Sequence, residues 1–405
     1  MSALPRFAFP NIRPITEALP SWPLLIAKMR ITTVIGGLGG GGAERVCVNL
    51  ANAWADRGHH VTILTMAKNV VAPAYAINAR VDLRDLGWPR HANSEELNAA
   101  SIAPVLRGLR QAGCPELIGQ ITLIALFRHL IHASTPDVVV SHIDMTNLRV
   151  LAAMQETGVP VIAVEHTDTG RVPFGPWQRT REALYRHASA VVASHPAIAD
   201  WLARRGAKAF AIPNPLVAPP QIQVEKNADR RRLVTFARLS REKQIPLLVR
   251  AFARLAPDYP GWDFDIYGTG PLHAPLTQLI ADLAPGRVHL RGFTADPYAV
   301  LHKADLFASA SWVEGFGNVI WEALACAVPV VAMECGAPVR SLVRDGIDGL
   351  IVPSNLELVP ALASLMGDDA RRAAFTARAA EVLTRYSIES SLKAWNTLLE
   401  KVVVR

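Results

Sequence analysis

Short apolar runs alternate with helical patterns along most of this chain, and that alternation restricts its fold more than any other feature. The runs are three to five residues long and many are rich in β-branched residues, which is typical of buried strands. Strands that alternate with helices form parallel sheets with helices packed on both faces. The expected strands are Ile31–Ile35, His60–Leu64, Asp137–Ser141, Pro160–Val164, Ala190–Ala193, Ala209–Ile212, Leu233–Phe236, Phe264–Tyr267, Val288–Leu290, Leu306–Ala308, Pro329–Ala332 and Leu350–Val352.

The alternation is interrupted once, and this interruption divides the chain into two domains. The stretch from Pro213 to Asp229 holds four prolines and is mostly polar after Val217, which is typical of a linker. A chain of 405 residues that is 50% apolar can bury two cores, because single cores stop growing near ~250–300 residues. We expect an α/β protein with two Rossmann-like, doubly wound domains that face each other across a cleft.

The expected domain boundaries follow from the same patterns. Residues 1–28 form an extension without fixed structure, 29–215 the first domain, 216–230 the linker, 231–385 the second domain and 386–405 a closing helix. Apolar residues recur at helical spacing from Ile388 to Glu400, so we expect this last helix to cross back to the first domain.

Charge and cysteine content narrow the class of protein. The four cysteines show neither metal-ligand nor disulfide-framework spacing, which fits a reducing compartment. The net charge of +7 favours anionic partners. The most apolar run, Leu117 to Leu130, is interrupted by Gln120 and Arg128 and is shorter than the ~20 residues of a spanning helix. We expect a cytoplasmic protein that can also contact the inner face of the cytoplasmic membrane.

A basic and apolar segment of the first domain is the candidate for that membrane contact. Arg107, Arg110 and Arg128 lie among leucines and isoleucines. Such a surface can rest on anionic lipids and meet a lipid-linked acceptor. An amphipathic core helix with solvated arginines explains the same pattern equally well.

A glycine-rich loop, Gly36 to Gly42, follows the first strand and precedes a helical pattern. Such a loop lets backbone N–H groups approach a phosphate at a helix N-terminus, although it also simply permits a tight turn. The spacing of a dinucleotide site is met as well. That site needs an acidic residue at the end of the second strand, but the strand there ends in Leu64-Thr65-Met66. A nicotinamide oxidoreductase is therefore disfavoured.

Two cations follow the first strand after the linker. Arg238 comes just after Leu233–Phe236, and Lys243 lies five residues on. A strand's carboxyl end faces the cleft, where the two cations can converge on one diphosphate. We place Lys243 near a helix start, where the dipole disfavours a cation unless an anion is bound. Solvated surface cations are the alternative.

Two glutamates flank a predicted helix start near Asn318. Glu314 lies in a loop next to Gly315, and Glu322 falls on the helix. The helix N-terminus can hold phosphate, and the carboxylates can accept hydrogen bonds from sugar hydroxyls on either side. A diphosphate flanked by two sugars is a nucleotide-sugar. Solvated surface glutamates are the alternative.

These motifs resemble those of the retaining glycosyltransferases called family 4, which have the GT-B fold, and the resemblance runs from Met29 to the end. The shared pattern is E-x7-E, met by Glu314 and Glu322 within Glu-Gly-Phe-Gly-(x)4-Glu-Ala-Leu-Ala. Further matches are the Arg238/Lys243 pair, Tyr267-Gly268-Thr269-Gly270-Pro271, Val288-His289-Leu290-Arg291-Gly292-Phe293 and Asp345-Gly346-Ile347-Asp348-Gly349-Leu350.

The resemblance implies roles for individual residues. The catalytic set would be Glu314, His166, Arg238 and Lys243. The donor would be bound by Gly41, Gly42, Arg238, Lys243, Gly292, Phe293, Phe316, Gly317, Asn318 and Glu322. His166 would touch the transferred sugar, and His142 is a second candidate on the acceptor side. The first domain would hold the acceptor and the second the nucleotide-sugar.

The resemblance also implies the reaction. A hexose or N-acetylhexosamine would pass, with retained configuration, from a nucleotide-sugar to a glycan or polyprenyl-diphosphate-linked glycan in polysaccharide synthesis. We favour a UDP-sugar, with GDP-mannose as the second possible donor. No cofactor, metal or nucleic acid is expected. Asp263-Phe264-Asp265 matches the D-x-D of metal-dependent glycosyltransferases, but its alternation along a strand favours a structural role. A sugar-nucleotide epimerase of the same fold and a non-catalytic nucleotide-sugar binder are the two competing functions.

Overall fold

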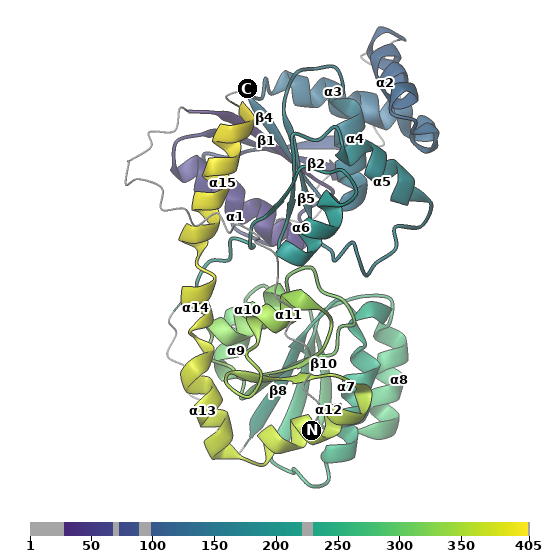
Figure 1. Cartoon of the computed structure of the whole chain (residues 1–405). Coiled ribbons are helices and arrows are strands. Elements are labelled where there is room, and N and C mark those ends of the chain that lie inside the picture. The colour runs from purple at the N-terminus through teal and green to yellow at the C-terminus, as the bar shows by residue number, and fades with distance from the viewer. Residues whose placement is uncertain (1–27, 68–72, 89–98, 221–229, 404–405) are drawn as a thin grey trace, which may run out of the picture.

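The computed structural model describes residues 28–67, 73–88, 99–220 and 230–403. The chain forms two lobes, each with a central parallel sheet and helices on both of its faces (Figure 1). The two Rossmann-like domains predicted from the alternation of strands and helices are therefore confirmed.

The first sheet has the order β3-β2-β1-β4-β5-β6-β7, and every pair of neighbours is parallel. Its strands are β1 (Arg30–Ile35), β2 (His60–Ala67), β3 (Asp82–Trp88), β4 (Val138–His142), β5 (Val161–Glu165), β6 (Ala190–Ala193) and β7 (Ala209–Ala211). The order reverses between β1 and β4, and open sheets bind ligands outside the carboxyl ends of the strands at such a reversal.

The second sheet has the order β10-β9-β8-β11-β12-β13 and is also parallel. Its strands are β8 (Arg231–Phe236), β9 (Trp262–Tyr267), β10 (Val288–Gly292), β11 (Leu306–Ser309), β12 (Val330–Met333) and β13 (Gly349–Val352). Its order reverses between β8 and β11. The segments with Arg238 and Glu314 follow these two strands, so both leave the sheet at its reversal point.

Every strand expected from the sequence is present, but β3 was missed. This strand lies at the edge of the first sheet and, among the residues that the structure describes, pairs with β2 alone. Its sequence carries Asp82, Arg84 and Asp85, because an edge strand is solvated along one side and tolerates charges. Such a strand lacks the continuous apolar run that identifies a buried one.

Helices connect the strands and cover both sheets (Figure 1). They are α1 (Gly42–Asp56), α2 (Ala99–Gln111), α3 (Ile121–Ala133), α4 (Asp144–Ala153), α5 (Gln178–Tyr185), α6 (Pro196–Ala203), α7 (Ile245–Leu255), α8 (His273–Leu283), α9 (Pro297–Lys303), α10 (Asn318–Ala325), α11 (Ala337–Leu342), α12 (Asn355–Met366), α13 (Asp369–Ala379), α14 (Val382–Arg385) and α15 (Ile388–Val403).

The closing helix crosses back to the first domain, as predicted. In Figure 1, α13 and α14 lie beside the second domain, and α15 continues along the first. Leu392, Trp395 and Leu399 of α15 are buried in the core formed by β1 and α1. The ring of Trp395 meets that of Trp54 edge to face, with their centroids 5.7 Å apart. The C-terminal segment therefore ties the two domains together.

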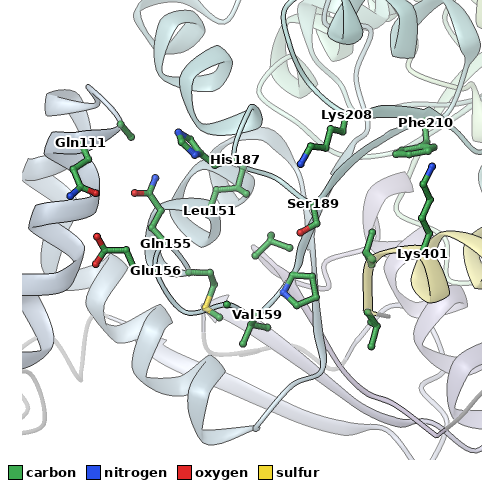
Figure 2. Close-up of a pocket in the computed structure, with 17 residues that line it drawn as sticks. Gln111, Leu151, Gln155, Glu156, Val159, His187, Ser189, Lys208, Phe210 and Lys401 are labelled. Atoms are coloured by element: carbon green, nitrogen blue, oxygen red, sulfur yellow. The ribbon is translucent and has the colours of Figure 1, made fainter. Parts of the chain in front are cut away.

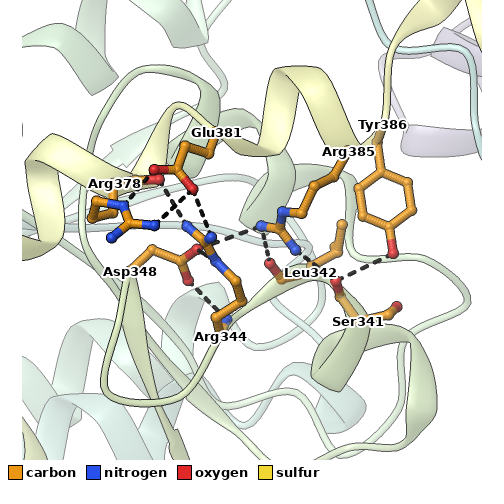
Figure 3. Close-up of polar contacts among 8 residues, drawn as sticks. All are labelled: Ser341, Leu342, Arg344, Asp348, Arg378, Glu381, Arg385 and Tyr386. Carbon is orange, nitrogen blue, oxygen red and sulfur yellow. Dashed lines mark hydrogen bonds and ion pairs between the residues drawn. The ribbon is translucent and has the colours of Figure 1, made fainter.

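An ion cluster around the buried Asp348 carboxylate holds α14 against the second domain (Figure 3). The Asp348 carboxylate is fully buried and accepts hydrogen bonds from the Arg344 guanidinium at 2.6 Å and from Arg385 at 3.4 Å. Arg385 also donates to the carbonyls of Ser341 and Leu342, at 2.9 and 2.7 Å. Asp348, the second aspartate of the sequence motif Asp345 to Leu350, thus anchors the crossing segment.

Two of the expected segments lie partly outside the described residues. These are the extension 1–28, of which only Lys28 is described, and the linker 216–230, of which 221–229 are not described. None of the helices in the described ranges is long and apolar enough to cross a membrane. The apolar run around Gln120 forms the end of a 3-10 helix (Pro115–Gln120) and most of α3.

The first-domain segment expected to offer a basic and apolar surface packs many of its large apolar side chains into the core. Leu123, Ile124 and Leu126 are buried in the core. Arg107 pairs with Glu156 at 3.1 Å, and Arg128 folds inward to donate to the carbonyls of Ala153 and Gln155. These contacts favour the alternative, core helices with peripheral arginines, for this segment, while contact with a membrane stays a prediction.

Candidate functional site

A cavity of about 820 Å³ lies between the carboxyl ends of the two sheets and is lined by both domains. From the first domain it takes Gly39 to Arg45, Ala74, Tyr75, His166, Thr167 and Asn214. From the second domain it takes Phe236 to Arg238, Lys243, Tyr267 to Gly270, Phe293 to Ala295, Pro297, Glu314 to Val319 and Glu322. All the site residues expected from the sequence line this cavity except His142 and Gly292.

Two glycines of the glycine loop, Gly40 and Gly42, are closely approached by side chains of the second domain. Gly40 has a φ of 103°, and a Cβ there would lie 2.8 Å from the Phe293 ring. A Cβ on Gly42 would lie 2.9 Å from the Asn318 amide nitrogen, which donates to the Gly42 carbonyl at 3.1 Å. Larger residues at these two positions would therefore displace the Phe293 ring or the Asn318 amide from the cavity wall.

The opposite wall contains the start of α10. Gly317 precedes this helix with a φ of 96°, a conformation that favours glycine. The free N–H groups of the first turn carry partial positive charge, which attracts an anion. Asn318, Val319 and Glu322 of this helix line the cavity. The sequence thus brings a helix N-terminus and a carboxylate to one wall.

Lys243 and Glu314 form an ion pair at this wall, with 2.6 Å between the Nζ and Oε1 atoms. Lys243 lies in a short 3-10 helix, Arg241–Lys243, that ends before α7 begins at Ile245. It therefore lies near a helix start, as expected, but in the short 3-10 helix that precedes α7 and not in the first turn of α7 itself. Arg238 lines the same cavity and is exposed, so its guanidinium is available to a ligand.

Glu322 is buried and pairs with Arg45 of the first domain, which sequence reasoning missed. The guanidinium of Arg45 lies over the rings of Tyr75 and Tyr298, 4.8 and 5.5 Å from their centroids. Burial raises the pKa of Glu322 to about 7, although Arg45 opposes that rise. The position of Arg45, three residues after the glycine loop, was the only sequence signal for it.

His166 lies at the cavity wall, just after β5, and is half-buried. Its Nε2 atom is 3.0 Å from Nδ1 of His142, which is the last residue of β4 and is fully buried. His142 therefore supports His166 from behind and has no surface to offer an acceptor in this structure. Burial lowers the pKa of His166 to about 4 and that of His142 well below its usual value.

The two domains touch directly beside His166. A Cβ on Gly315 would lie 2.1 Å from the carbonyl oxygen of His166. The Ser194 hydroxyl donates to the Gly315 carbonyl at 2.5 Å. The loop of Glu314 is thus fixed against the first domain by backbone contact that only glycine permits.

The two phenylalanines expected at this site lie in different environments, one exposed and one buried. Phe293 is 54% exposed and stands at the cavity edge after β10, so its ring is free to meet a planar group. Gly292 has a φ of 72° and ends β10 just before it. Phe316 is buried, with its ring edge-on to Tyr386, and supports the loop between Glu314 and α10.

The two aspartates of the D-x-D motif lie outside this cavity and are already engaged. Asp263 pairs with Arg230 and Arg287, each at 3.3 Å. Asp265 pairs with Arg232 at 2.6 Å and Arg291 at 2.7 Å. These contacts join neighbouring strands, which agrees with the structural role expected from their alternation.

A second cavity, of about 870 Å³, lies at the opposite edge of the first sheet (Figure 2). It is lined by residues that precede β6 and β7, such as Ser189 and Lys208, and by Lys401 near the end of α15. It holds none of the expected site residues. The cavity between the domains is therefore the candidate functional site.

Two family models match the chain. The model described as Glycosyltransferase Family 4 matches residues 40–217, and the one described as Glycosyl transferases group 1 matches residues 230–368. Between them these ranges contain both walls of the cavity.

Some curated relatives match over most of this chain. An exopolysaccharide phosphotransferase of Streptomyces coelicolor is 28% identical over 90% of the chain and 40% of its own length. An alpha-1,4-N-acetyl-D-galactosaminyltransferase of Campylobacter jejuni, whose name gives an undecaprenol-linked GalNAc glycan, is 23% identical over 92% of the chain and 99% of its own length. The chain spans at most 40% of the length of the first three curated relatives.

Solved structures share the fold. Anabaena HepE in complex with UDP and glucose superposes with a TM-score of 0.71 at 21% identity, covering 92% of this chain and 99% of HepE. At this identity the match establishes the two-domain architecture.

Proposed function

We propose that this chain, which belongs to glycosyltransferase family 4, transfers a hexose or N-acetylhexosamine from a UDP-sugar to a glycan or polyprenyl-diphosphate-linked glycan. The observation that carries the proposal is the arrangement of charges in the cavity between the domains. Arg238, Lys243 and the start of α10 offer positive charge at its wall, and Glu314 and Glu322 stand at either side of that helix start. This is the charge pattern of a diphosphate between two sugars.

Each part of the nucleotide-sugar donor has its own partners in this cavity. Arg238 forks onto two oxygens of the diphosphate, while Lys243 acts as a point charge and the helix start supplies N–H donors. Glu322 accepts hydrogen bonds from the ribose hydroxyls, and Glu314 from those of the transferred sugar. The base lies against the exposed ring of Phe293. A diphosphate at Lys243 releases Glu314 from its ion pair, which frees that carboxylate for the sugar.

The reaction retains configuration by substitution on one face of the sugar. The acceptor hydroxyl oxygen bonds to the anomeric carbon as the bond from that carbon to the diphosphate oxygen breaks. The leaving diphosphate takes the proton from the acceptor hydroxyl. Arg238, Lys243 and the start of α10 stabilise the charge that develops on the leaving group. Neither glutamate acts as a nucleophile, in contrast to the carboxylate of retaining glycosidases.

No metal ion or other cofactor takes part in this scheme. The charge on the diphosphate is met by the two cations and the helix start, and both D-x-D carboxylates are occupied by arginines. Transfer should continue unchanged in excess EDTA. Loss of transfer in EDTA that added Mg²⁺ or Mn²⁺ restores would contradict metal independence.

A thermal-shift panel of UDP- and GDP-sugars tests the donor, because a ligand that binds only the folded state stabilises it by about 2.7 kcal/mol at 100 times its Kd. We expect the melting temperature to rise with UDP-sugars. The UDP in the HepE complex supports this choice. A rise with GDP-mannose alone would identify a mannosyltransferase instead.

Product analysis tests the reaction class. A transferase slowly releases UDP from its donor and yields an α-linked product from an α-linked donor, which NMR coupling constants at the anomeric proton report. An isomerised sugar nucleotide would identify the epimerase. Binding without any turnover in the presence of an acceptor pool would identify the non-catalytic binder.

Contact with anionic membrane rests on the net charge of +7 and on the undecaprenol-linked glycan in the name of the Campylobacter relative. Flotation with vesicles of phosphatidylglycerol and phosphatidylcholine is the test. We expect binding that weakens as salt rises. Equal binding to vesicles of phosphatidylcholine alone would show that charge is not the cause.

A further inference from the structure

Behind His166, three buried groups join it in a continuous hydrogen-bonded chain that leads away from the cavity. Nε2 of His166 lies 3.0 Å from Nδ1 of His142, and Nε2 of His142 lies 3.0 Å from the hydroxyl of Thr33. That hydroxyl lies 3.4 Å from the thiol of Cys47. Thr33, Cys47 and His142 are all fully buried, so water does not compete for these contacts.

The members of this chain come from four elements of the first domain. Thr33 is on β1, Cys47 on α1, His142 at the end of β4, and His166 follows β5. Because β1 and β4 are neighbours at the reversal point of the sheet, the chain runs from the sheet interior to the cavity. The His142 and His166 rings also stack, with their centroids 5.3 Å apart. Nothing in the sequence motifs indicated this connection.

The number of protons on the two imidazole rings allows only two directions of hydrogen bonding between His142 and His166. Burial keeps both imidazoles neutral, so each ring carries one N–H and uses its other nitrogen as an acceptor. One proton lies between the two rings. If His142 donates it, then Nδ1 of His166 carries an N–H. If His166 donates it, then Nδ1 of His166 is an acceptor.

The Cys47 end of this hydrogen-bonded series favours donation from His142 to His166. A thiol is a weak donor and its sulfur a weak acceptor, whereas an imidazole nitrogen is a good acceptor. Burial raises the pKa of the Cys47 thiol to about 12, so it keeps its proton. The thiol then donates to Thr33, Thr33 to Nε2 of His142, and His142 to Nε2 of His166. The opposite direction would end the hydroxyl's hydrogen bond on sulfur.

We propose that Thr33 and His142 are positioning residues that fix His166 as the tautomer with its N–H on Nδ1. His166 lines the cavity, and Nδ1 has no hydrogen-bond partner within the described part of the chain. It is therefore a neutral donor that meets an oxygen of the sugar in the cavity. This inference rests on the proposed function for the identity of the ligand, but the tautomer itself does not depend on it.

The paired variants Thr33→Val and Thr33→Ser test the proposal. Valine matches the shape of threonine but lacks the hydroxyl, whereas serine keeps it. Long-range ¹H–¹⁵N spectra of the ¹⁵N-histidine-labelled protein report the tautomer of each ring directly. We expect Nδ1–H at His166 in the wild type and in Thr33→Ser. In Thr33→Val we expect a mixture, because Nε2 of His142 has lost its donor.

The kinetic readout separates positioning from structural damage. We expect Thr33→Val to lower kcat about tenfold, the effect of roughly one net hydrogen bond, with the KM for the donor unchanged and Thr33→Ser near wild type. His142→Phe should act in the same direction and serves if Thr33→Val does not fold. Two results would overturn the proposal. One is an Nε2–H tautomer at His166 in the wild type, and the other is an unchanged His166 tautomer in both Thr33→Val and His142→Phe. Absence of transfer with the expected tautomers would instead refute the proposed function.

Discussion

The ion pair between Arg45 and Glu322 links the two domains, and its contribution to stability should depend on pH. The side chains are only 11% and 6% exposed. Burial raises the pKa of Glu322 from 4.5 to about 7, which corresponds to about 3 kcal/mol at ~1.36 kcal/mol per unit. Because the folded pKa is the higher one, the folded state favours the protonated carboxyl. The stability gained from the protonated Glu322 carboxyl in the folded state is fully present below pH 4.5 and is lost as the pH rises through about 7.

Replacing Arg45 by Met removes the cation that opposes the burial of Glu322. At pH 8 the wild-type carboxyl is largely ionised against Arg45, whereas without Arg45 its pKa rises further and folding must take up a proton. This adds about 1.4 kcal/mol at one pH unit above 7, so with the lost ring contacts we expect the free energy of unfolding to fall by roughly 2 kcal/mol. At pH 5 the carboxyl is protonated in both proteins. There the loss should shrink to about 1 kcal/mol, mainly the contacts of the guanidinium with the rings of Tyr75 and Tyr298.

Urea unfolding followed by tryptophan fluorescence at pH 5 and pH 8 measures both values. Arg110→Met is the matched control, because Arg110 is exposed and its replacement should change stability by less than about 0.5 kcal/mol at either pH. Adding Glu322→Gln to Arg45→Met should abolish the pH dependence of the loss. Equal losses for Arg45→Met at pH 5 and pH 8 would refute the argument that charge on Glu322 causes the effect.

Three further substitutions test the site and the fold. Glu314→Gln should lower kcat about 100-fold, as for loss of one preorganised polar group in a transition state; full transfer by this variant would remove the catalytic role of Glu314. Gly315→Ala should force the walls apart, since its Cβ would lie 2.1 Å from the His166 carbonyl. We expect weaker UDP binding in a thermal-shift assay, whereas Gly119→Ala, where no atom lies within 4 Å of the added Cβ, should bind UDP normally. Asp348→Asn should lower the free energy of unfolding by about 3 kcal/mol, because it removes the charge of the buried carboxylate that Arg344 and Arg385 share; a loss below about 1 kcal/mol in urea titrations would show that the cluster does not anchor α14.

The strands and the two-domain organisation could be predicted because their signals are local. A strand buried on both faces needs a continuous apolar run, and such a run is visible within five residues. The closing helix was predicted from the spacing of residues such as Leu392 and Trp395 for the same reason. The edge strand Asp82–Trp88 was missed because one of its sides is solvated and its charges hide the pattern.

The place of several candidate residues at the cavity was predictable because they follow the carboxyl ends of strands. Arg238 follows β8 and Glu314 follows β11, and parallel strands bring such ends to one edge of the sheet. The sequence could not show which of these groups pair. Arg45 and Glu322 are 277 positions apart, so their contact exists only once both domains have folded and closed on each other.

Local sequence patterns specify where the strands run, where the glycine turns fall and which polar residues reach the cavity. How those residues are used depends on the packing of the folded chain. His142 and His166 looked alike in sequence, since each stands at the carboxyl end of a strand. Packing placed His142 inside the domain and His166 at the cavity wall, because burial depends on every element that covers a strand end and not on the strand alone.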